Sequence, residues 1–356
     1  QEIMKKEHIL VIRFSAMGDV AMTVPVIQSL AEQYPDLRIT MLSQKFARPF
    51  FEHMPHNVGF MEADLKNEYH GVKGLNALYR RLMAKNFTAI ADLHSVLRSK
   101  YLRMRFNIDR FKVAHINKHR AGRRAITAME NKQLVQQPTP FSNYADVFAQ
   151  LGYPAKVEFE SIFADGGNEL SQLSEPFNVK PEEQQWIGVA PFAAHKGKIY
   201  PKEQMEKTLT IISDRHPDAR ILMFGGGKSE MDTMAAWRER NPRLEIASRV
   251  LGGIDKELIL MSHLDVMLSM DSSNMHLASL VGTPVVSVWG ATHPYAGFMG
   301  WGQSESNAVM IDMPCRPCSI YGNKICKKGD YPCLTGITPE QIAGRVDIVL
   351  LQEKRK

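Results

Sequence analysis

The chain has 356 residues, of which 44% are hydrophobic and 23% are charged, so it can bury two sizeable cores. It contains no run of about 18 apolar residues, which excludes a membrane-spanning helix. The net charge of +6 predicts an anionic partner without choosing among phosphate, nucleic acid, acidic glycan and membrane surface. No secretory signal leads the chain and its cysteines are clustered, so we expect a cytoplasmic protein.

Predicted strands alternate with predicted helices in the first half of the chain. Residues 8–14 form a largely continuous apolar run, which is typical of a strand buried on both faces. Apolar residues at helical spacing follow, and residues 38–42 and 88–93 are the next predicted strands. This alternation predicts a parallel, doubly wound sheet in a first domain over residues 1–170.

The second half repeats this alternation after a polar stretch with Gly and Pro at residues 165–185, which we interpret as a linker. Strands are predicted at 186–191, 220–224, 265–270 and 284–289, and a helix at 202–215. We expect a second Rossmann-like domain over residues 186–337 and a helix over 338–356 that could pack back on the first domain. Open parallel sheets bind ligands where their strands end, so a cleft between two facing domains is the expected active site.

A turn of small residues, Ser15 to Asp19, follows the first predicted strand. Gly18 allows the backbone to turn sharply or to approach a ligand closely. Asp19 lies near a helix start, where Asp commonly caps free N–H groups. A carboxylate at this edge of a sheet can also take a proton from an acceptor hydroxyl, and the residues alone leave both roles open.

Two strand-to-helix loops of the second half offer groups suited to an anion. Lys198 follows Gly197 on a basic loop, and its ammonium can meet a diphosphate, although a solvated loop is the alternative. Residues 271–274 open a helix whose free N–H groups and positive dipole end suit a phosphate, with His276 in the first turn. An ordinary capped helix is the alternative there.

Small residues at 290–292 would let a sugar or phosphate come close, although a plain connecting turn is the simpler interpretation. Neither this turn nor the glycines at 225–227 form a G-x-G-x-x-G motif after the first strand. This absence disfavours a nicotinamide or flavin dehydrogenase, and we expect no cofactor.

The cysteines form the pattern Cys315-x2-Cys318-x7-Cys326-x6-Cys333. Four thiolates can hold a structural zinc ion, but the interval between the pairs is shorter than in common zinc ribbons. Structural metal and free or paired thiols therefore both stay open, and no catalytic metal is expected.

Residues 98–124 contain ten Lys or Arg and a single acidic residue, Asp109. A solvated face is the plain interpretation. The functional alternative is a landing site for a phosphorylated or carboxylated acceptor at a membrane surface.

Several motifs, in this order, resemble those of glycosyltransferase family 9, the lipopolysaccharide heptosyltransferases. They are residues 13–19 followed by Pro25, then 92–99, 198–201, 271–276 and 282–284, and the cysteine-bearing tail around 315–318. The resemblance covers about residues 8–349. It implies a GT-B fold, an α/β architecture of two facing Rossmann-like, doubly wound domains with a cleft between them, the acceptor on the first and the nucleotide-sugar on the second.

The resemblance also implies chemistry: inverting transfer of heptose from ADP-heptose onto a lipopolysaccharide core-type acceptor, without a metal. The sequence agrees in containing no Asp-x-Asp, the usual metal–diphosphate motif of other transferases. By position, Asp19 resembles the general base and Lys198 the diphosphate contact. The other donor-binding residues that it implies are Asp271, Ser272, Ser273 and His276. The further substrate-binding residues are Ser15, Gly18, Arg98, Gly290, Ala291 and Thr292.

The chain departs from the family pattern at His94, where Gln is common, and at His293, where Asp is common. The expected partners are a nucleotide-diphosphate sugar and an anionic lipid-linked saccharide, with peripheral contact at the cytoplasmic face of the inner membrane left open. Two rivals are a nucleotide-sugar epimerase or hydrolase on the same scaffold and a non-catalytic nucleic-acid-binding protein. We expect no nucleic acid partner, because no recognisable binding module or set of stacking aromatics is present.

Overall fold

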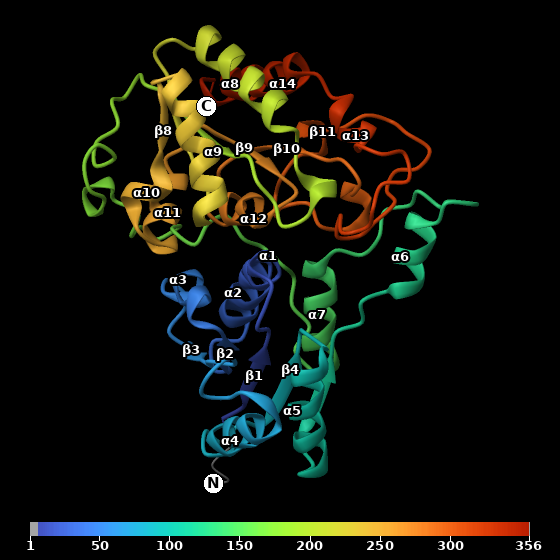
Figure 1. Ribbon diagram of the computed structural model, residues 1–356. Coiled ribbons are helices and arrows are strands. Elements are labelled where there is room, and N and C mark those ends of the chain that lie inside the picture. The colour runs from blue at the N-terminus through green and yellow to red at the C-terminus, as the bar shows by residue number, and fades with distance from the viewer. Residues whose placement is uncertain (1–5, 356) are drawn as a thin grey trace. The chain divides into compact units, whose positions relative to one another are not determined.

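The computed structural model describes residues 6–355, which divide into two compact units (Figure 1). The first unit comprises the residues up to 118 together with 138–162, and the second comprises 119–137 and everything from 163 onward. The boundary expected at residue 170 therefore lies at 163, and residues 119–137 belong with the second half, which the sequence did not indicate. None of the helices between residues 6 and 355 combines the length and hydropathy that a bilayer crossing requires.

The first unit contains a five-stranded sheet, in the order β3-β2-β1-β4-β5, with every neighbouring pair parallel. Its strands are β1 (His8–Ile12), β2 (Arg38–Ser43), β3 (Val58–Glu62), β4 (Ala89–Asp92) and β5 (Lys112–His115). Its helices are α1 (Met17–Ala21), α2 (Thr23–Gln33), α3 (Arg48–Phe51), α4 (Gly71–Met83), α5 (Leu97–Ile108) and α7 (Pro140–Gln150). The central strand β1 is buried at every position, as its continuous apolar run predicts.

The second unit contains a six-stranded sheet, in the order β11-β10-β9-β6-β7-β8, also with parallel neighbours. Its strands are β6 (Trp186–Ala190), β7 (Arg220–Met223), β8 (Leu244–Ile246), β9 (Val266–Met270), β10 (Val285–Val288) and β11 (Ala308–Val309). Its helices are α6 (Arg120–Thr127), α8 (Lys202–Arg215), α9 (Gly227–Arg240), α10 (Ala247–Leu251), α11 (Ile254–Met261), α12 (Ser273–Leu280), α13 (Pro332–Thr335) and α14 (Pro339–Glu353). Short 3-10 turns occur at Lys45–Ala47, Leu170–Gln172, Lys196–Lys198, Pro294–Ala296 and Glu305–Asn307. The strands predicted from 186 to 289 and the helix at 202–215 are thus confirmed.

The stretch at 165–185 is not a free linker, because it packs on the second unit. Leu173 and Phe177 are buried at 5% and 1% exposure, and Lys180 forms an ion pair with Asp265 at 2.8 Å between Nζ and Oδ2. The segment is mostly polar, which suggested a linker, but the burial of Leu173 and Phe177 holds it on the second unit.

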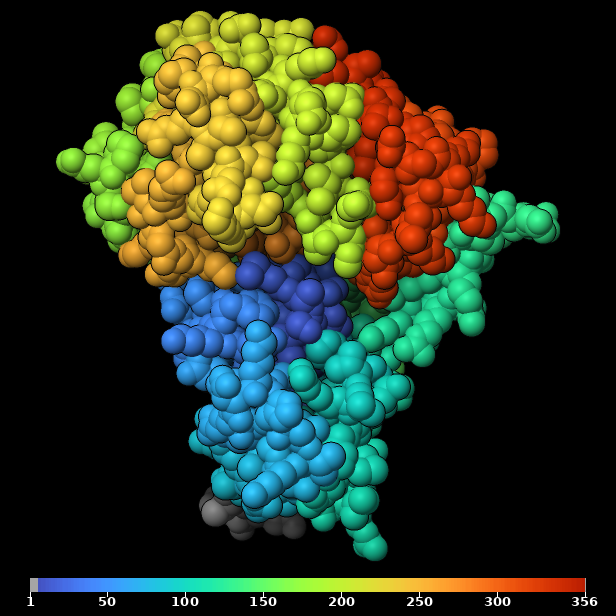
Figure 2. Space-filling model, in the orientation of Figure 1, coloured from blue at the N-terminus to red at the C-terminus, as the bar shows by residue number. Residues whose placement is uncertain are grey.

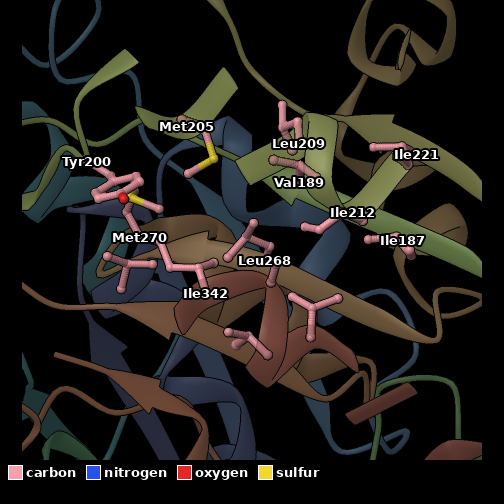
Figure 3. Packing of buried hydrophobic residues seen from close by; sticks show 14 of the residues in the cluster. Ile187, Val189, Tyr200, Met205, Leu209, Ile212, Ile221, Leu268, Met270 and Ile342 are labelled. Atoms are coloured by element: carbon pink, nitrogen blue, oxygen red, sulfur yellow. The ribbon is translucent and has the colours of Figure 1, made fainter. Parts of the chain in front are cut away.

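The helix predicted over 338–356 is present as α14, and its apolar face packs in the core of the second unit. Thr338 caps the helix, because its side-chain oxygen accepts a hydrogen bond from the Gln341 N–H and its own N–H donates to Gln341 Oε1. Ile342, on the buried face, joins a cluster that includes Leu268 and Met270 of β9 (Figure 3). The helix itself was predictable from its own periodicity, whereas its partner was not.

We predict that Ile342→Ala lowers the free energy of unfolding of the protein by about 2–5 kcal/mol, since it leaves a cavity in a fully buried place. Leu351→Ala on the same helix removes a side chain that is 57% exposed, so its effect should stay within about 0.5 kcal/mol. Chemical denaturation of both variants measures the difference. Equal losses would contradict the packing assigned to α14.

Candidate functional site

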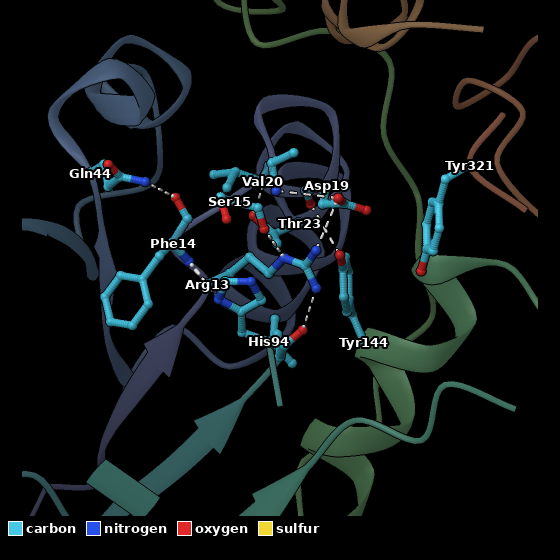
Figure 4. A network of polar contacts seen from close by, with 12 residues as sticks. Arg13, Phe14, Ser15, Asp19, Val20, Thr23, Gln44, His94, Tyr144 and Tyr321 are labelled. Atoms are coloured by element: carbon cyan, nitrogen blue, oxygen red, sulfur yellow. Dashed lines mark hydrogen bonds and ion pairs between the residues drawn. The ribbon is translucent and has the colours of Figure 1, made fainter. Parts of the chain in front are cut away.

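Asp19 lies in the first turn of α1, directly after the strand β1 ends (Figure 4). Its Oδ2 accepts a hydrogen bond from the Ala16 N–H at 3.3 Å and pairs with Arg13 Nη2 at 3.0 Å. The capping role that the sequence left open is therefore real. The Asp19 side chain is 26% exposed, and Oδ1 has no hydrogen-bond or ion-pair partner among residues 6–355. One oxygen is thus held in place while the other stays available to a ligand.

Arg13 is fixed by two further bonds besides its ion pair with Asp19. Its Nε donates to the carbonyl of Ser15 at 2.6 Å, and its Nη1 donates to the carbonyl of Leu93 at 3.0 Å. The Tyr144 hydroxyl of α7 donates to the backbone carbonyl of Asp19 at 3.1 Å. Arg13 had one sequence signal, a charge at the end of an apolar strand. Tyr144 had none, because it approaches from a distant part of the chain.

His94 follows β4 at the same edge of the sheet and is held in one tautomer. Its Nδ1 accepts a hydrogen bond from the Phe14 N–H at 3.3 Å, and an amide can only donate, so the ring proton lies on Nε2. Burial, together with the nearby charges of Arg13, Lys118 and Arg98, lowers the pKa of His94 to about 3. The ring is therefore neutral at physiological pH. Arg98, a predicted substrate contact, lies exposed in the first turn of α5.

Three predicted residues meet in the second unit. Lys198 Nζ lies 3.5 Å from Asp271 Oδ2, and the Thr292 hydroxyl donates to the same oxygen at 2.8 Å. These residues follow β6, β9 and β10, so three strand ends bring them together. Asp271 is 4% exposed, so its buried carboxylate holds the Lys198 ammonium by an ion pair.

The start of α12 contains the remaining predicted donor residues. Ser272 is the N-cap residue, yet its side chain makes no capping hydrogen bond and instead contacts Ser269 Oγ at 3.2 Å. Ser273 begins the helix, and His276 is buried in its first turn. An N-terminus without a side-chain cap presents N–H groups and a positive dipole end to an anion.

The cysteine-bearing tail is hydrogen-bonded to the two loops that hold Lys198 and Thr292. The Gly197 N–H donates to the Gly322 carbonyl at 3.1 Å, and the Ala291 N–H donates to the Gly197 carbonyl at 2.9 Å. The Cys318 N–H donates to the Ala291 carbonyl at 3.1 Å. A Cβ at Gly197 would lie 2.7 Å from the Gly322 oxygen, which is too close, so glycine is required there.

Arg316 ties the same elements together from the inside. Its guanidinium donates to the carbonyls of Gly290, Thr292 and Ile311 at 2.6, 3.0 and 2.6 Å, and the residue is 4% exposed. Burial lowers the pKa of Arg316, and the surrounding acidic groups oppose that shift. Its place between two cysteines in the sequence gave no signal for this role.

All four cysteines are free thiols. Burial raises the pKa of Cys333 to about 11 and also raises that of Cys318. Between residues 6 and 355 the structure has no group of three or more His, Cys, Asp or Glu placed to hold a metal ion. Burial therefore disfavours the reactive thiolate form of Cys318 and Cys333.

Three histidines make the stability of the protein sensitive to acid. Burial lowers the pKa of His8 and of His293 to about 4, and that of His94 to about 3, from an ordinary value of 6.5. The unfolded chain binds protons more tightly, so the free energy of unfolding is complete above about pH 6.5 and falls as the pH falls toward 4.

We predict that His94→Gln makes this fall shallower, because Gln keeps an acceptor for the Phe14 N–H and does not titrate. The wild type, measured in the same buffers, provides the reference slope. Denaturant titrations at several pH values between 7 and 4 measure it. An unaltered slope in His94→Gln would show that this ring is not buried as a neutral group.

A family model described as glycosyltransferase family 9 (heptosyltransferase) matches residues 75–328. The lipopolysaccharide core heptosyltransferase OpsX of Haemophilus influenzae is 23% identical over 297 residues, which cover 81% of this chain and 80% of that protein. The solved family 9 glycosyl transferase of Veillonella parvula has a TM-score of 0.73 at 19% identity, with 98% of each chain covered. The ADP-heptose lps heptosyltransferase II of E. coli has a TM-score of 0.69 at 16% identity, with 98% and 99% covered.

These structural likenesses confirm the GT-B class of fold, with its two Rossmann-like parts, that the motifs implied. The family match spans more than half of the sequence and includes the loops that hold His94, Lys198, Asp271 and Thr292. The chain therefore belongs to glycosyltransferase family 9, and it is a glycosyltransferase.

Proposed function

We propose that the enzyme transfers heptose from ADP-heptose to a lipopolysaccharide core-type acceptor, with Asp19 as the general base. The relatives named for lipopolysaccharide heptosyl transfer support the substrate class. The observation that supports this mechanism most directly is that the two oxygens of the Asp19 carboxylate have different surroundings. Its Oδ2 is held by Arg13 and the Ala16 N–H, whereas its Oδ1 has no hydrogen-bond or ion-pair partner among the described residues.

Asp19 Oδ1 takes the proton of the acceptor hydroxyl as the oxygen attacks the anomeric carbon of the donor. The new glycosidic bond forms on the face opposite the phosphate, and the bond from the anomeric carbon to the phosphate oxygen breaks. The electron pair leaves with ADP, and the proton stays on Asp19. The configuration at the anomeric carbon is thereby inverted.

The leaving group gains negative charge as that bond breaks, and the second unit supplies the groups that stabilise it. The Lys198 ammonium, held by Asp271, meets the diphosphate, and the N–H groups at Ser272 and Ser273 complete the anion site. We assign the sugar or ribose side of the donor to the turn at Gly290, Ala291 and Thr292. This charge arrangement replaces a divalent metal, in keeping with a sequence that has no Asp-x-Asp.

The acceptor side belongs to the first unit in this proposal. Ser15 and Gly18 form the turn beside Asp19, and the neutral His94 offers its Nε2–H as a donor at the same sheet edge. Arg98 supplies a cation for the acidic groups of the acceptor. Because that acceptor is lipid-linked, we propose peripheral contact with the cytoplasmic face of the inner membrane.

We predict that Asp19→Asn lowers turnover by about 10²–10⁴-fold, the usual contribution of a general base. The amide oxygen of Asn still accepts from the Ala16 N–H, so the melting temperature should change little. Transfer of labelled heptose to acceptor measures turnover. Near-normal turnover would leave Asp19 as a helix cap only, and release of free heptose from the wild type without acceptor would favour a hydrolase.

We predict that Lys198→Ala lowers turnover by about 10²–10³-fold, the effect of losing one preorganised charge-stabilising group. Lys196→Ala in the same 3-10 turn is the matched control, since that side chain is exposed. Calorimetry should show weaker ADP binding to Lys198→Ala alone, with chelator present throughout. Equal behaviour of the two variants, or a requirement for divalent metal, would contradict the assignment.

A further inference from the structure

Helix α5 exposes large apolar side chains at positions where a helix that faces water usually has polar residues. Leu97, Met104 and Ile108 are 86%, 47% and 68% exposed. Their spacing of seven and four residues places them on one face of the helix, because each residue turns the helix by about 100°. The opposite face, with Leu102 and Phe106, is buried in the core of the first unit. The exposed stripe is thus separate from the apolar face that folding requires.

Helix α4 extends this face beside α5. The Asn76 side-chain oxygen of α4 accepts hydrogen bonds from the Tyr101 hydroxyl at 2.6 Å and from Arg105 Nη1 at 2.5 Å. Val72 and Met83 of α4 are 62% and 38% exposed. The two helices lie next to each other on the surface of the first unit, from blue to teal in Figure 2. We call the exposed side of α4 and α5 the α4–α5 surface.

The charges on the α4–α5 surface have one sign. Neither helix contains Asp or Glu, whereas together they contain seven Lys or Arg: Lys73, Arg80, Arg81, Arg98, Lys100, Arg103 and Arg105. Arg103 is paired with the buried Asp92, and Arg81 contacts Tyr69. Lys73, Arg80 and Lys100 are exposed, and they flank the apolar stripe.

We propose that the α4–α5 surface docks the enzyme on a bilayer of anionic phospholipid. A helix that lies in the membrane interface combines an apolar stripe, which enters the acyl boundary, with flanking cations, which meet the lipid phosphates. The same combination is present here. A protein partner would have to present acidic groups and apolar side chains together, whereas an anionic bilayer supplies both.

Docking by this surface would also serve the reaction, and in this respect the inference rests on the proposed function. Helix α5 begins three residues after His94, at the sheet edge where β1 delivers Asp19. A bilayer under Leu97 would therefore lie close to the side of the first unit to which we assign a lipid-linked acceptor. The basic stretch that begins at Arg98 thereby acquires a function beyond acceptor binding.

The test is cosedimentation of the full chain with phosphatidylcholine vesicles, with and without phosphatidylglycerol. The wild type should bind the anionic vesicles only, and salt should weaken binding, because the cations contribute to it. Met104→Asp with Ile108→Asp should reduce the bound fraction at least about tenfold. Lys73→Glu with Lys100→Glu, which changes exposed charges without touching the stripe, should reduce it as well.

The matched control is Leu134→Asp with Val135→Asp, a pair that is 48% and 57% exposed in the second unit and follows the arginines of α6. It should bind like the wild type. Absence of wild-type binding, or an equal loss in the control pair, would overturn the proposal. So would a dimer in sedimentation velocity that Met104→Asp with Ile108→Asp dissolves, since a second copy would then cover this surface.

A soluble acceptor without its lipid separates docking from catalysis. Met104→Asp with Ile108→Asp should transfer heptose to it at the wild-type rate, while transfer to acceptor embedded in anionic vesicles falls. Loss of transfer to both acceptors would contradict a pure docking role. If no form of the enzyme transfers heptose, the proposed function fails, yet vesicle binding still decides the docking surface.

Discussion

The parallel direction of all the strands is the constraint on which the rest of this structure depends. Because neighbours in each sheet run the same way, their carboxyl ends meet at one edge. The turn after β1 thereby delivers Asp19 beside the loop after β4, whose Leu93 carbonyl holds Arg13. In the second sheet, three strand ends likewise bring Lys198, Asp271 and Thr292 within contact distance. Side chains that are far apart in the sequence are thereby brought together at these two edges.

The loops at the second edge are not held by the sheet alone. Arg316 is buried, and a buried guanidinium is stable only where its N–H groups are satisfied. It donates to carbonyls on both sides of Ala291, and the tail also accepts from the Gly197 N–H. The tail thus fixes the distance between the two loops that position Lys198 and Thr292. This explains how the cysteine-bearing tail supports the two loops that hold Lys198 and Thr292.

Local patterns predicted the local elements and the positions of the motifs. The strand at β1 and the helix α8 follow from apolar periodicity, and Lys198 and Asp271 from their places after strands. Long-range contacts could not be predicted from such patterns, because periodicity does not indicate which other segment a helix or loop will pack against. Residues 119–137 join the second unit through contacts such as Lys132 Nζ with the Pro317 carbonyl at 2.6 Å. The short strand β11 and the partner of α14 were missed for the same reason.

The proposed mechanism is a single displacement in which a carboxylate deprotonates the acceptor while ADP departs from the opposite face. The anomeric configuration of the product records that geometry directly. NMR of the disaccharide unit made from ADP-heptose should show the configuration opposite to that of the donor. Retention of the donor configuration would contradict the proposal. Retention requires either two successive displacements through a covalent intermediate or attack on the same face from which ADP leaves, and a general base at Asp19 provides neither route.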